Sequence, residues 1–348
     1  MKTPLQKLLR PHILAIQPYQ SARHEFTDQG DAITFMDANE NPFDNGVNRY
    51  PDPFQTELKA VLASQKGLSP EQIFLSNGSD ESIVLLIQLF CQPGEEAILI
   101  AQPTFGMYEV AAQIQDVAVK KVPLTTDFQL DVAGLLASAD AHTKLLFIPS
   151  PNNPTGNAFP EEELKTLLRG FSGLVVLDEA YWEFSDRPSA IAWLDEFPNL
   201  VVLQTFSKAQ GRAGIRLGMA FAQPELIDYL NRVKLPYNIN ILTQQSALRA
   251  LEETNRTTQQ LEWLADEKQK LTNALNRCSF VNKCFPSDAN FLLIRVDDAP
   301  KRYRQFLEAG IVLRNTSKYL HCDQTLRITV GTPDENNALM ALLNTLDR

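Results

Sequence analysis

The sequence predicts an α/β protein in which a mostly parallel sheet, covered on both faces by helices, is followed by a smaller α+β domain. Three observations predict this fold. From residue 73 to residue 207, short apolar runs alternate with helical stretches, as in repeated βαβ units. The apolar runs are continuous, which is typical of parallel strands that are buried on both faces. Beyond Pro224 the chain changes to a long polar helical stretch followed by short strands.

The elements of the sheet follow one another in a regular order. The expected strands of the sheet are 73–76, 97–101, 119–124, 144–150, 173–180 and 199–207, and a short strand at 32–37 precedes them. The expected helices are 56–65, 80–90, 105–114, 130–139 and 161–170. The last of these helices begins with Pro160 and three glutamates, which suit a helix N-terminus.

The remaining chain is expected to form a smaller domain that is joined to the sheet by a long helix. A helix from Glu225 leads to Pro236, and a polar helical stretch then runs to about Asn276. Short strands follow at 279–283, 290–296 and 326–330. These features divide the chain into an N-terminal arm with part of the small domain (1–45), a large domain (46–250) and a small C-terminal domain (251–348).

Composition excludes several classes of function. The net charge of −10 argues against binding to nucleic acid or to an anionic membrane surface. No apolar run is long enough to span a membrane. The four cysteines have no metal-ligand spacing, so no metal site is expected, and reduced thiols indicate a cytoplasmic protein.

Polar and aromatic side chains follow five of the expected strands, at the point where each strand ends. Because the carboxyl ends of parallel strands meet at one edge of a sheet, these side chains are expected to face one crevice. The segments are 77–81 (NGSDE), 102–105 (QPTF), 151–156 (PNNPTG), 178–181 (DEAY) and 205–208 (TFSK). Taken alone, each has a plainer explanation as a helix N-cap, a turn, a core residue or a surface lysine. Only the ordered series favours a ligand site.

One chemistry requires this set of residues, that of pyridoxal 5′-phosphate. Lys208 can form a Schiff base with the aldehyde of this cofactor, which then acts as an electron sink. Asp178 can keep the ring nitrogen protonated, while Asn153 and Tyr181 can donate hydrogen bonds to the phenolic oxygen. Phe105 offers an aromatic face to the ring. The residues expected to hold the phosphate are Gly78, Ser79, Asp80, Thr205, Ser207 and Arg216.

Three of these motifs resemble those of the fold type I, aspartate-aminotransferase-like enzymes, and the resemblance covers nearly the whole chain. They are 150–156 (SPNNPTG), 178–181 (DEAY) and 205–208 (TFSK) with Arg216. The resemblance implies a seven-stranded type of sheet in the large domain. Within that group, further segments resemble those of the histidinol-phosphate aminotransferases. They are 18–23 (PYQSAR), 39–42 (NENP), 49–51 (RYP), 103–108 (PTFGMY) and 326–332 (LRITVGT).

The resemblance implies amino transfer between L-histidinol phosphate and 2-oxoglutarate, with Lys208 as the residue that holds the cofactor and as the general base. It implies a homodimer in which Tyr50 reaches the cofactor phosphate of the partner subunit. Tyr19, Arg314 and Arg327 are the implied substrate-binding residues. Replacing Arg327 is expected to leave the spectrum of the bound cofactor unchanged. The N-terminal segment then belongs to the mature enzyme, which argues against a transit peptide.

Two features depart from the family pattern. The stacking position, which is often tyrosine in the family, is Phe105, so the ring is kept and the hydroxyl is lost. Gln210 and Arg212 follow Lys208 where apolar residues are common in the family. The contacts of this loop are therefore left open, although the spacing from the lysine to Arg216 agrees with the pattern.

Other functions would keep the same cofactor residues. An aromatic or broad-range aminotransferase and a threonine-phosphate decarboxylase would both retain them, so only the substrate-side segments favour histidinol phosphate. A non-catalytic regulator that senses the cofactor would need a DNA-binding module ahead of the domain. The stretch before the first sheet motif is too short for one, and the chain is acidic, whereas DNA-binding domains are basic.

Overall fold

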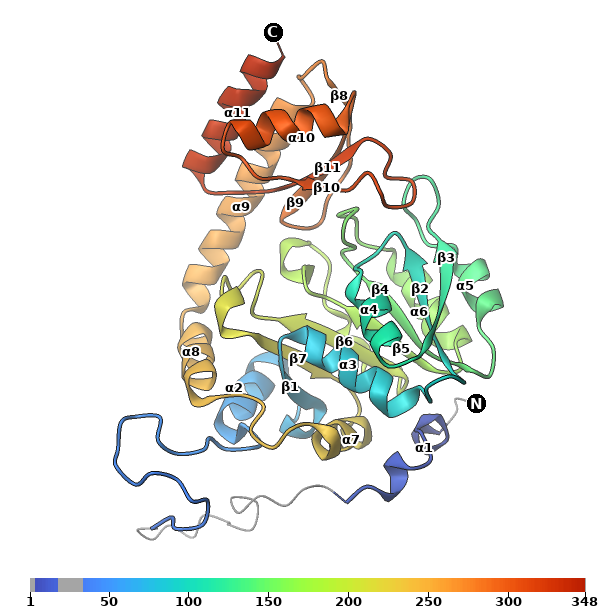
Figure 1. Ribbon diagram of the computed structural model, residues 1–348, viewed down its shortest axis with the longest axis vertical. Coiled ribbons are helices and arrows are strands. Elements are labelled where there is room, and N and C mark those ends of the chain that lie inside the picture. The colour runs from blue at the N-terminus through green and yellow to red at the C-terminus, as the bar shows by residue number, and fades with distance from the viewer. Residues whose placement is uncertain (1–3, 18–33, 348) are drawn as a thin grey trace.

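The main body of the protein is a seven-stranded sheet in the order β1-β7-β6-β5-β4-β2-β3, seen in a computed structural model that describes residues 4–17 and 34–347 (Figure 1). The expected mostly parallel sheet is confirmed. Strand β7 differs, since it pairs antiparallel with both β1 and β6. The strands are β1 (Ile73–Asn77), β2 (Ala97–Gln102), β3 (Ala118–Pro123), β4 (Thr143–Pro149), β5 (Leu174–Asp178), β6 (Leu200–Thr205) and β7 (Leu217–Phe221).

Helices cover both faces of this sheet, and successive strand residues point to opposite faces. Phe147 and Val176 pack on one side, while Leu146 and Val175 pack on the other. The first side carries α1 (Leu5–Leu8), α3 (Ser79–Phe90), α4 (Met107–Ile114) and α7 (Pro224–Val233). The second side carries α2 (Thr56–Lys66), α5 (Val132–Ser138), α6 (Glu161–Gly170) and α8 (Ile241–Glu252). Burial on both faces explains why the strands are apolar without alternation.

The main differences from the expected elements concern β7, the long helix and the segment 32–37. Strand β7 was not predicted, because its five residues follow the loop after β6 with no intervening α-helix; all five are buried. The expected long helix is two helices, α8 and α9 (Thr254–Leu275), which meet at Glu253, where the backbone leaves helical geometry with ψ at 29°. The expected strand at 32–37 is not formed over its described part, 34–37.

A second, smaller sheet confirms the expected α+β part of the chain. Its four strands are antiparallel in the order β10-β11-β9-β8, and α9 leads to it from the large sheet (Figure 1). Leu271, Ile294 and Phe306 belong to its separate core. Its elements are β8 (Val281–Cys284), β9 (Phe291–Val296), α10 (Ala299–Glu308), β10 (Arg314–Asn315), β11 (Thr325–Thr329) and α11 (Pro333–Leu346).

The described start of the chain lies against the large sheet. Leu8, Leu9 and Ile13 belong to the core beneath α3 and α7. Nη1 of Arg10 donates to the carbonyl oxygen of Gln88 at 2.8 Å. These contacts do not involve the small sheet, and the domain boundaries themselves stay predictions. Within the described ranges, no helix has both the length and the apolar character that crossing a membrane would require.

Candidate active site

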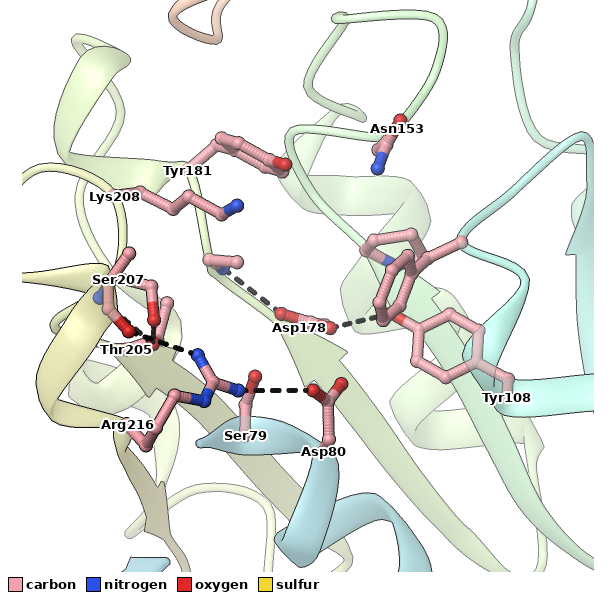
Figure 2. A pocket seen from close by; sticks show the side chains of 14 residues that line it. Ser79, Asp80, Tyr108, Asn153, Asp178, Tyr181, Thr205, Ser207, Lys208 and Arg216 are labelled. Carbon is pink, nitrogen blue, oxygen red and sulfur yellow. Dashed lines mark hydrogen bonds and ion pairs between the residues drawn. The ribbon is translucent and has the colours of Figure 1, made fainter. Parts of the chain in front are cut away.

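A cavity of about 670 Å³, its open mouth included, lies at the carboxyl ends of β4, β5 and β6 (Figure 2). Each of the five strand-end segments singled out from the sequence contributes at least one residue to its wall. The lining residues are Ser79, Asp80, Phe105, Tyr108, Pro149, Asn153, Asp178, Ala180, Tyr181, Thr205, Ser207, Lys208, Ala213 and Arg216. The sheet therefore brings these segments together in one crevice.

Lys208 lies on the loop after β6, and its Nζ is 5.5 Å from the centre of the Tyr181 ring (Figure 2). Partial burial lowers the pKa of this amine, and the positive charge of Arg327 lowers it further, while Asp178 opposes the change. A lowered pKa leaves more of the amine neutral at working pH. Neutral lysine is the form that attacks an aldehyde and accepts a proton, so the cavity favours the reactive form of Lys208.

Asp178 ends β5 and lies inside the cavity with 4% of its surface exposed. The hydroxyl of Tyr108 donates to its Oδ2 at 2.7 Å, and the backbone N–H of Ala180 donates to its Oδ1 at 3.1 Å. Burial raises the pKa of Asp178, and the two hydrogen bonds oppose this rise. A buried carboxylate that has only neutral hydrogen-bond partners is costly unless a cation joins it. A protonated pyridine ring fits this requirement.

Ser79 and Arg216 form a cradle at the start of α3. Gly78, which precedes them in the cradle, has a φ of +72°, and a Cβ at this position would lie 2.5 Å from Nη2 of Arg216. Only glycine fits there. The backbone N–H groups of the helix N-terminus and the guanidinium both attract anions. The hydroxyls of Thr205 and Ser207 lie 3.0 Å apart beside Arg216 (Figure 2), so this set of donors fits a phosphate group.

Asp80 contributes to this cradle in a more limited way than the sequence indicates. Its Oδ2 lies 3.5 Å from Nη2 of Arg216, so the carboxylate is paired with the guanidinium. A carboxylate cannot donate a hydrogen bond to a phosphate and repels its charge. The backbone N–H of Asp80 is therefore the only part of this residue that suits the phosphate, and its side chain orients Arg216.

Asn153 links the cavity to the small sheet. Nη1 of Arg327, on β11, donates to Oδ1 of Asn153, and the amide nitrogen of Asn153 points into the cavity (Figure 2). The guanidinium of Arg327 also lies 5.1 Å from the centre of the Phe291 ring, which packs edge-on against Tyr181. Arg327 thus contacts one residue of the cavity wall and packs beside another, so the expected effect of its replacement on the spectrum of the bound cofactor stays a prediction that this contact brings into question.

Arg314 and Arg327 lie directly opposite each other on β10 and β11. In the described ranges, neither guanidinium has a carboxylate partner within 4.0 Å. Burial lowers the pKa of Arg327, as does the charge of Arg314, while Tyr181 opposes the change. Arginine still stays protonated at neutral pH, since its ordinary pKa is above about 12. Two adjacent positive charges without acidic partners favour binding of an anion over a structural ion pair.

Tyr50 does not reach the cavity of its own chain. It is 51% exposed, and its ring stacks on that of Tyr237 with 4.4 Å between centroids. Val47 and Leu242 line the same surface groove and are exposed as well. The predicted role of Tyr50 therefore requires a second chain. Tyr19, the remaining predicted substrate residue, lies outside the described residues.

Sequence reasoning missed four lining residues, namely Tyr108, Pro149, Ala180 and Ala213. Tyr108 is the one among them with a reactive group. It follows Phe105 by three positions, and the two rings meet edge-on at 5.6 Å. That spacing is the signal that could have found it, since both residues belong to the expected helix 105–114 and side chains three apart on a helix share one face. In the structure, α4 begins only at Met107. An aromatic residue in an amphipathic helix is otherwise interpreted as core.

Gln210 and Arg212, which depart from the family pattern, have partners outside the cavity. Nε2 of Gln210 donates to Oε1 of Glu183 at 2.9 Å. Nη2 of Arg212 lies 3.1 Å from Oε2 of Glu253, between α8 and α9. The two residues tie the loop after Lys208 to neighbouring segments. The loop contacts that the sequence left open are therefore structural ones.

The order of the sheet, with a lysine on the loop after β6 and an aspartate at the end of β5, defines the protein as a fold type I enzyme that uses pyridoxal phosphate. The donors of the cradle and the buried carboxylate fit the phosphate and the ring of that cofactor. The sequence also matches the family described as Aminotransferase class I and II over residues 28–343.

Known proteins agree with this class. A histidinol-phosphate aminotransferase of Christiangramia forsetii is 48% identical over 343 residues, which cover 99% of this chain and 98% of that protein. The structure of the histidinol-phosphate aminotransferase from Clostridium acetobutylicum has a TM-score of 0.80 at 25% identity, covering 86% of this chain and 91% of that chain. The enzyme of that name from Sinorhizobium meliloti, in complex with pyridoxal-5′-phosphate, shares the fold with a TM-score of 0.77 at 23% identity, covering 86% and 83%. The chain belongs to the class I and II aminotransferase family and is a pyridoxal-phosphate-dependent transaminase.

Proposed function

We propose that the enzyme exchanges the amino group of L-histidinol phosphate with 2-oxoglutarate, giving imidazole acetol phosphate and L-glutamate in histidine biosynthesis. The observation that carries this proposal is the pair Arg314 and Arg327, which lie side by side without an acidic partner among the described residues. A guanidinium matches the geometry of both phosphate and carboxylate, so one pair can serve both substrates in turn. Relatives of this name at 48% identity over nearly the full chain support the same substrate.

We propose that the cavity residues hold pyridoxal phosphate in the following way. Asp178 pairs with the ring nitrogen, Phe105 stacks on the ring, and Asn153 and Tyr181 donate to the phenolic oxygen. The groups proposed for the phosphate are the backbone around Gly78, Ser79 and Asp80 together with Thr205, Ser207 and Arg216. When bound, the cofactor supplies an aldehyde that captures an amine and a ring that accepts electrons from Cα of the substrate.

Lys208 is the group that we propose moves the proton. Its lowered pKa provides a neutral amine, which holds the cofactor at rest and removes the proton from Cα of the amino substrate. Arg314 and Arg327 hold the phosphate or carboxylate end of the substrate, which fixes the position of Cα. The aromatic rings of Phe105 and Tyr181 line the cavity between these groups and limit the access of water.

We propose a homodimer in which Tyr50 contributes to the cavity of the partner subunit. Its exposure and the exposed apolar side chains of Val47 and Leu242 in the same groove support a subunit contact on this face. The substrate-binding role of Tyr19 rests on the family resemblance alone. We also propose a cytoplasmic location, since all four cysteines are free thiols, as expected in a reducing compartment.

A steady-state comparison tests the proposed substrate. It measures kcat/KM for histidinol phosphate, phenylalanine and threonine phosphate, each with 2-oxoglutarate. We expect histidinol phosphate to be preferred over phenylalanine by at least about a hundredfold, because a site built around a phosphate leaves its arginines unpaired without one. A preference for phenylalanine would identify an aromatic or broad-range aminotransferase, and release of carbon dioxide from threonine phosphate would identify a decarboxylase. Either result overturns the proposal.

A further inference from the structure

Among the described residues, Tyr108 is the only one whose side chain forms a hydrogen bond to Asp178. It lies on α4 and is fully buried, with 0% of its surface exposed. Its ring stacks on Phe147 with 4.9 Å between centroids and meets Phe105 edge-on at 5.6 Å. The ring is therefore held on two sides, and its hydroxyl is aimed at Oδ2 of Asp178 at 2.7 Å (Figure 2).

The hydroxyl of Tyr108 acts as a donor toward this carboxylate. Burial and the negative charge of Asp178 raise the pKa of Tyr108 well above its usual range, so the phenol keeps its proton at working pH. A hydroxyl bound to an ionised acceptor forms one of the stronger kinds of hydrogen bond in proteins. The bond also fixes the plane of the carboxylate, since Ala180 holds the other oxygen.

We propose that Tyr108 is a positioning residue that acts through Asp178, keeping this carboxylate ionised and oriented toward the ring nitrogen of the cofactor. Tyr108 also forms the support of Phe105, the ring that faces the cofactor, so one side chain fixes two of its neighbours. The inference depends on the assignment of pyridoxal phosphate and not on the identity of the amino substrate.

Some of the groups around Asp178 raise its pKa and others lower it. Burial raises its pKa, and the carboxylate of Asp80, on α3, also raises it. The amine of Lys208, on the loop after β6, lowers it, as do the hydrogen bonds from Tyr108 and from the N–H of Ala180. Removing the hydroxyl of Tyr108 therefore raises the pKa of Asp178 further. The ionised carboxylate is the form that pairs with the protonated ring. As the pH is lowered, the variant should therefore begin to lose cofactor affinity at a higher pH than the wild type does.

The test compares Tyr108→Phe with Tyr229→Phe. Tyr229 is a buried tyrosine on α7 that does not line the cavity, and its hydroxyl forms no hydrogen bond within the described part of the chain. Equilibrium dialysis of each holoenzyme between about pH 5 and pH 9 gives the dissociation constant of pyridoxal phosphate as a function of pH. Thermal melting of the same samples shows that both variants are folded.

We expect Tyr108→Phe to bind the cofactor roughly tenfold more weakly near neutral pH, or about 1.4 kcal/mol. The pH below which affinity falls should move up by roughly one unit. Tyr229→Phe should match the wild type in both respects. A Tyr108→Phe enzyme whose affinity and pH profile equal those of the wild type would overturn the proposal.

A double-mutant cycle separates action through Asp178 from a general packing effect. In an Asp178→Asn background, the hydroxyl of Tyr108 has no charge to stabilise, so adding Tyr108→Phe should change the dissociation constant by less than about twofold. An equal loss in both backgrounds would show that Tyr108 does not act through Asp178. All these measurements use the cofactor alone. A different amino substrate would therefore overturn the proposed function and leave this inference standing.

Discussion

The side of the site proposed to hold the cofactor and the side proposed to bind the substrate are built in different ways. The cofactor side comes from the strand ends of one sheet, and its groups are held by near neighbours, as Asp178 is held by Tyr108. The substrate side is assembled from separate parts of the chain. Arg327, on the small sheet, reaches Asn153 of the large one across 174 positions of sequence. Tyr50, expected to reach the cofactor phosphate of a partner subunit, lies on an exposed face away from the cavity of its own chain.

This difference indicates which properties each side controls. The cofactor side is built within one chain apart from Tyr50, which is proposed to come from the partner subunit, so its residues should govern whether the cofactor is retained and whether the chemistry proceeds. The substrate side depends on the position of the small sheet. Its residues should therefore govern substrate affinity, whereas effects that depend on assembly are expected for Tyr50. Four predictions test this separation.

The largest effect is expected for Lys208→Ala. Removing the group that holds the cofactor and moves the proton should reduce kcat by at least about 10⁴-fold, although the cradle still holds some cofactor. The measurement is kcat, together with borohydride reduction followed by peptide mass analysis. In the wild type, reduction should leave a pyridoxyl group on the peptide that contains Lys208. Lys165→Ala, which removes a lysine of α6 that pairs with Glu161 outside the cavity wall, is the control and should keep both properties.

A result that contradicts this prediction is easy to recognise. A Lys208→Ala enzyme with near-wild-type turnover, or a pyridoxyl group on another lysine, would remove Lys208 from the cofactor side altogether.

The next largest effect is expected on replacing Arg327 or Arg314. It tests the contact between the substrate side and the cofactor side of the site. Arg327→Ala should raise KM for histidinol phosphate about ten- to a hundredfold through loss of a charge-assisted contact. It should also shift the absorbance of the bound cofactor, because the amide of Asn153 loses the donor that orients it. Arg314→Ala should raise KM without changing the absorbance, since Arg314 meets Arg327 but not Asn153. An unchanged spectrum in Arg327→Ala would show that the two sides are independent.

A smaller effect is expected for Tyr50, and it tests assembly. Tyr50→Ala should weaken cofactor binding about tenfold, as expected for loss of one hydrogen bond to a phosphate. Hybrid dimers of Tyr50→Ala with Lys208→Ala subunits, purified by two different tags, should recover about half of the wild-type turnover, because one of their two cavities is intact. If Tyr50 served the cavity of its own chain, the hybrids would be no more active than a mixture of the two parent dimers.

Much of the cofactor side could be predicted from the sequence, for a physical reason. Asp178 and Lys208 each end a continuous apolar run, and parallel strands bring their carboxyl ends together whatever the details of packing. Tyr108 was not predicted because it lies on an amphipathic helix, where most aromatic residues simply pack in the core. Nothing in the neighbouring sequence shows that its hydroxyl has a polar partner. Only the tertiary contact with Asp178 shows it.

The substrate side could be predicted only by resemblance. Nothing local marks Arg314 and Arg327 as neighbours until β10 and β11 pair. Tyr50 carries no sequence signal for its partner, because that partner is proposed to be another chain. Strand β7 was missed because a five-residue apolar run can belong to a strand or to a helix. The break at Glu253 was missed because no glycine or proline marks it in the sequence.

The smallest effect is expected for Gln210→Ala, which concerns the loop that carries Lys208. Burial raises the pKa of Glu183, and the hydrogen bond from Gln210 opposes that rise. Without Gln210 the ionised carboxylate of Glu183 loses a donor, at a cost of about 1 kcal/mol in the free energy of unfolding. The cost applies to the charged form. It should be largest above the raised pKa of Glu183 and should fade as the pH falls through that pKa and the carboxyl becomes protonated.

Urea unfolding at about pH 8 and about pH 5 measures this difference. Arg212→Ala is the matched control, because its partner Glu253 is 45% exposed and no buried carboxyl is involved. Its effect on the free energy of unfolding should be below about 1 kcal/mol.

The kcat of Gln210→Ala should stay close to that of the wild type, because the loop is held at more than one point and Gln210 lies outside the cavity wall. A loss of stability that is equal at both pH values would mean that Gln210 supports the loop by packing alone. A large fall in kcat would mean that the contact between Gln210 and Glu183 is needed for turnover. Both residues would then count as part of the cofactor side and not as purely structural residues of this loop.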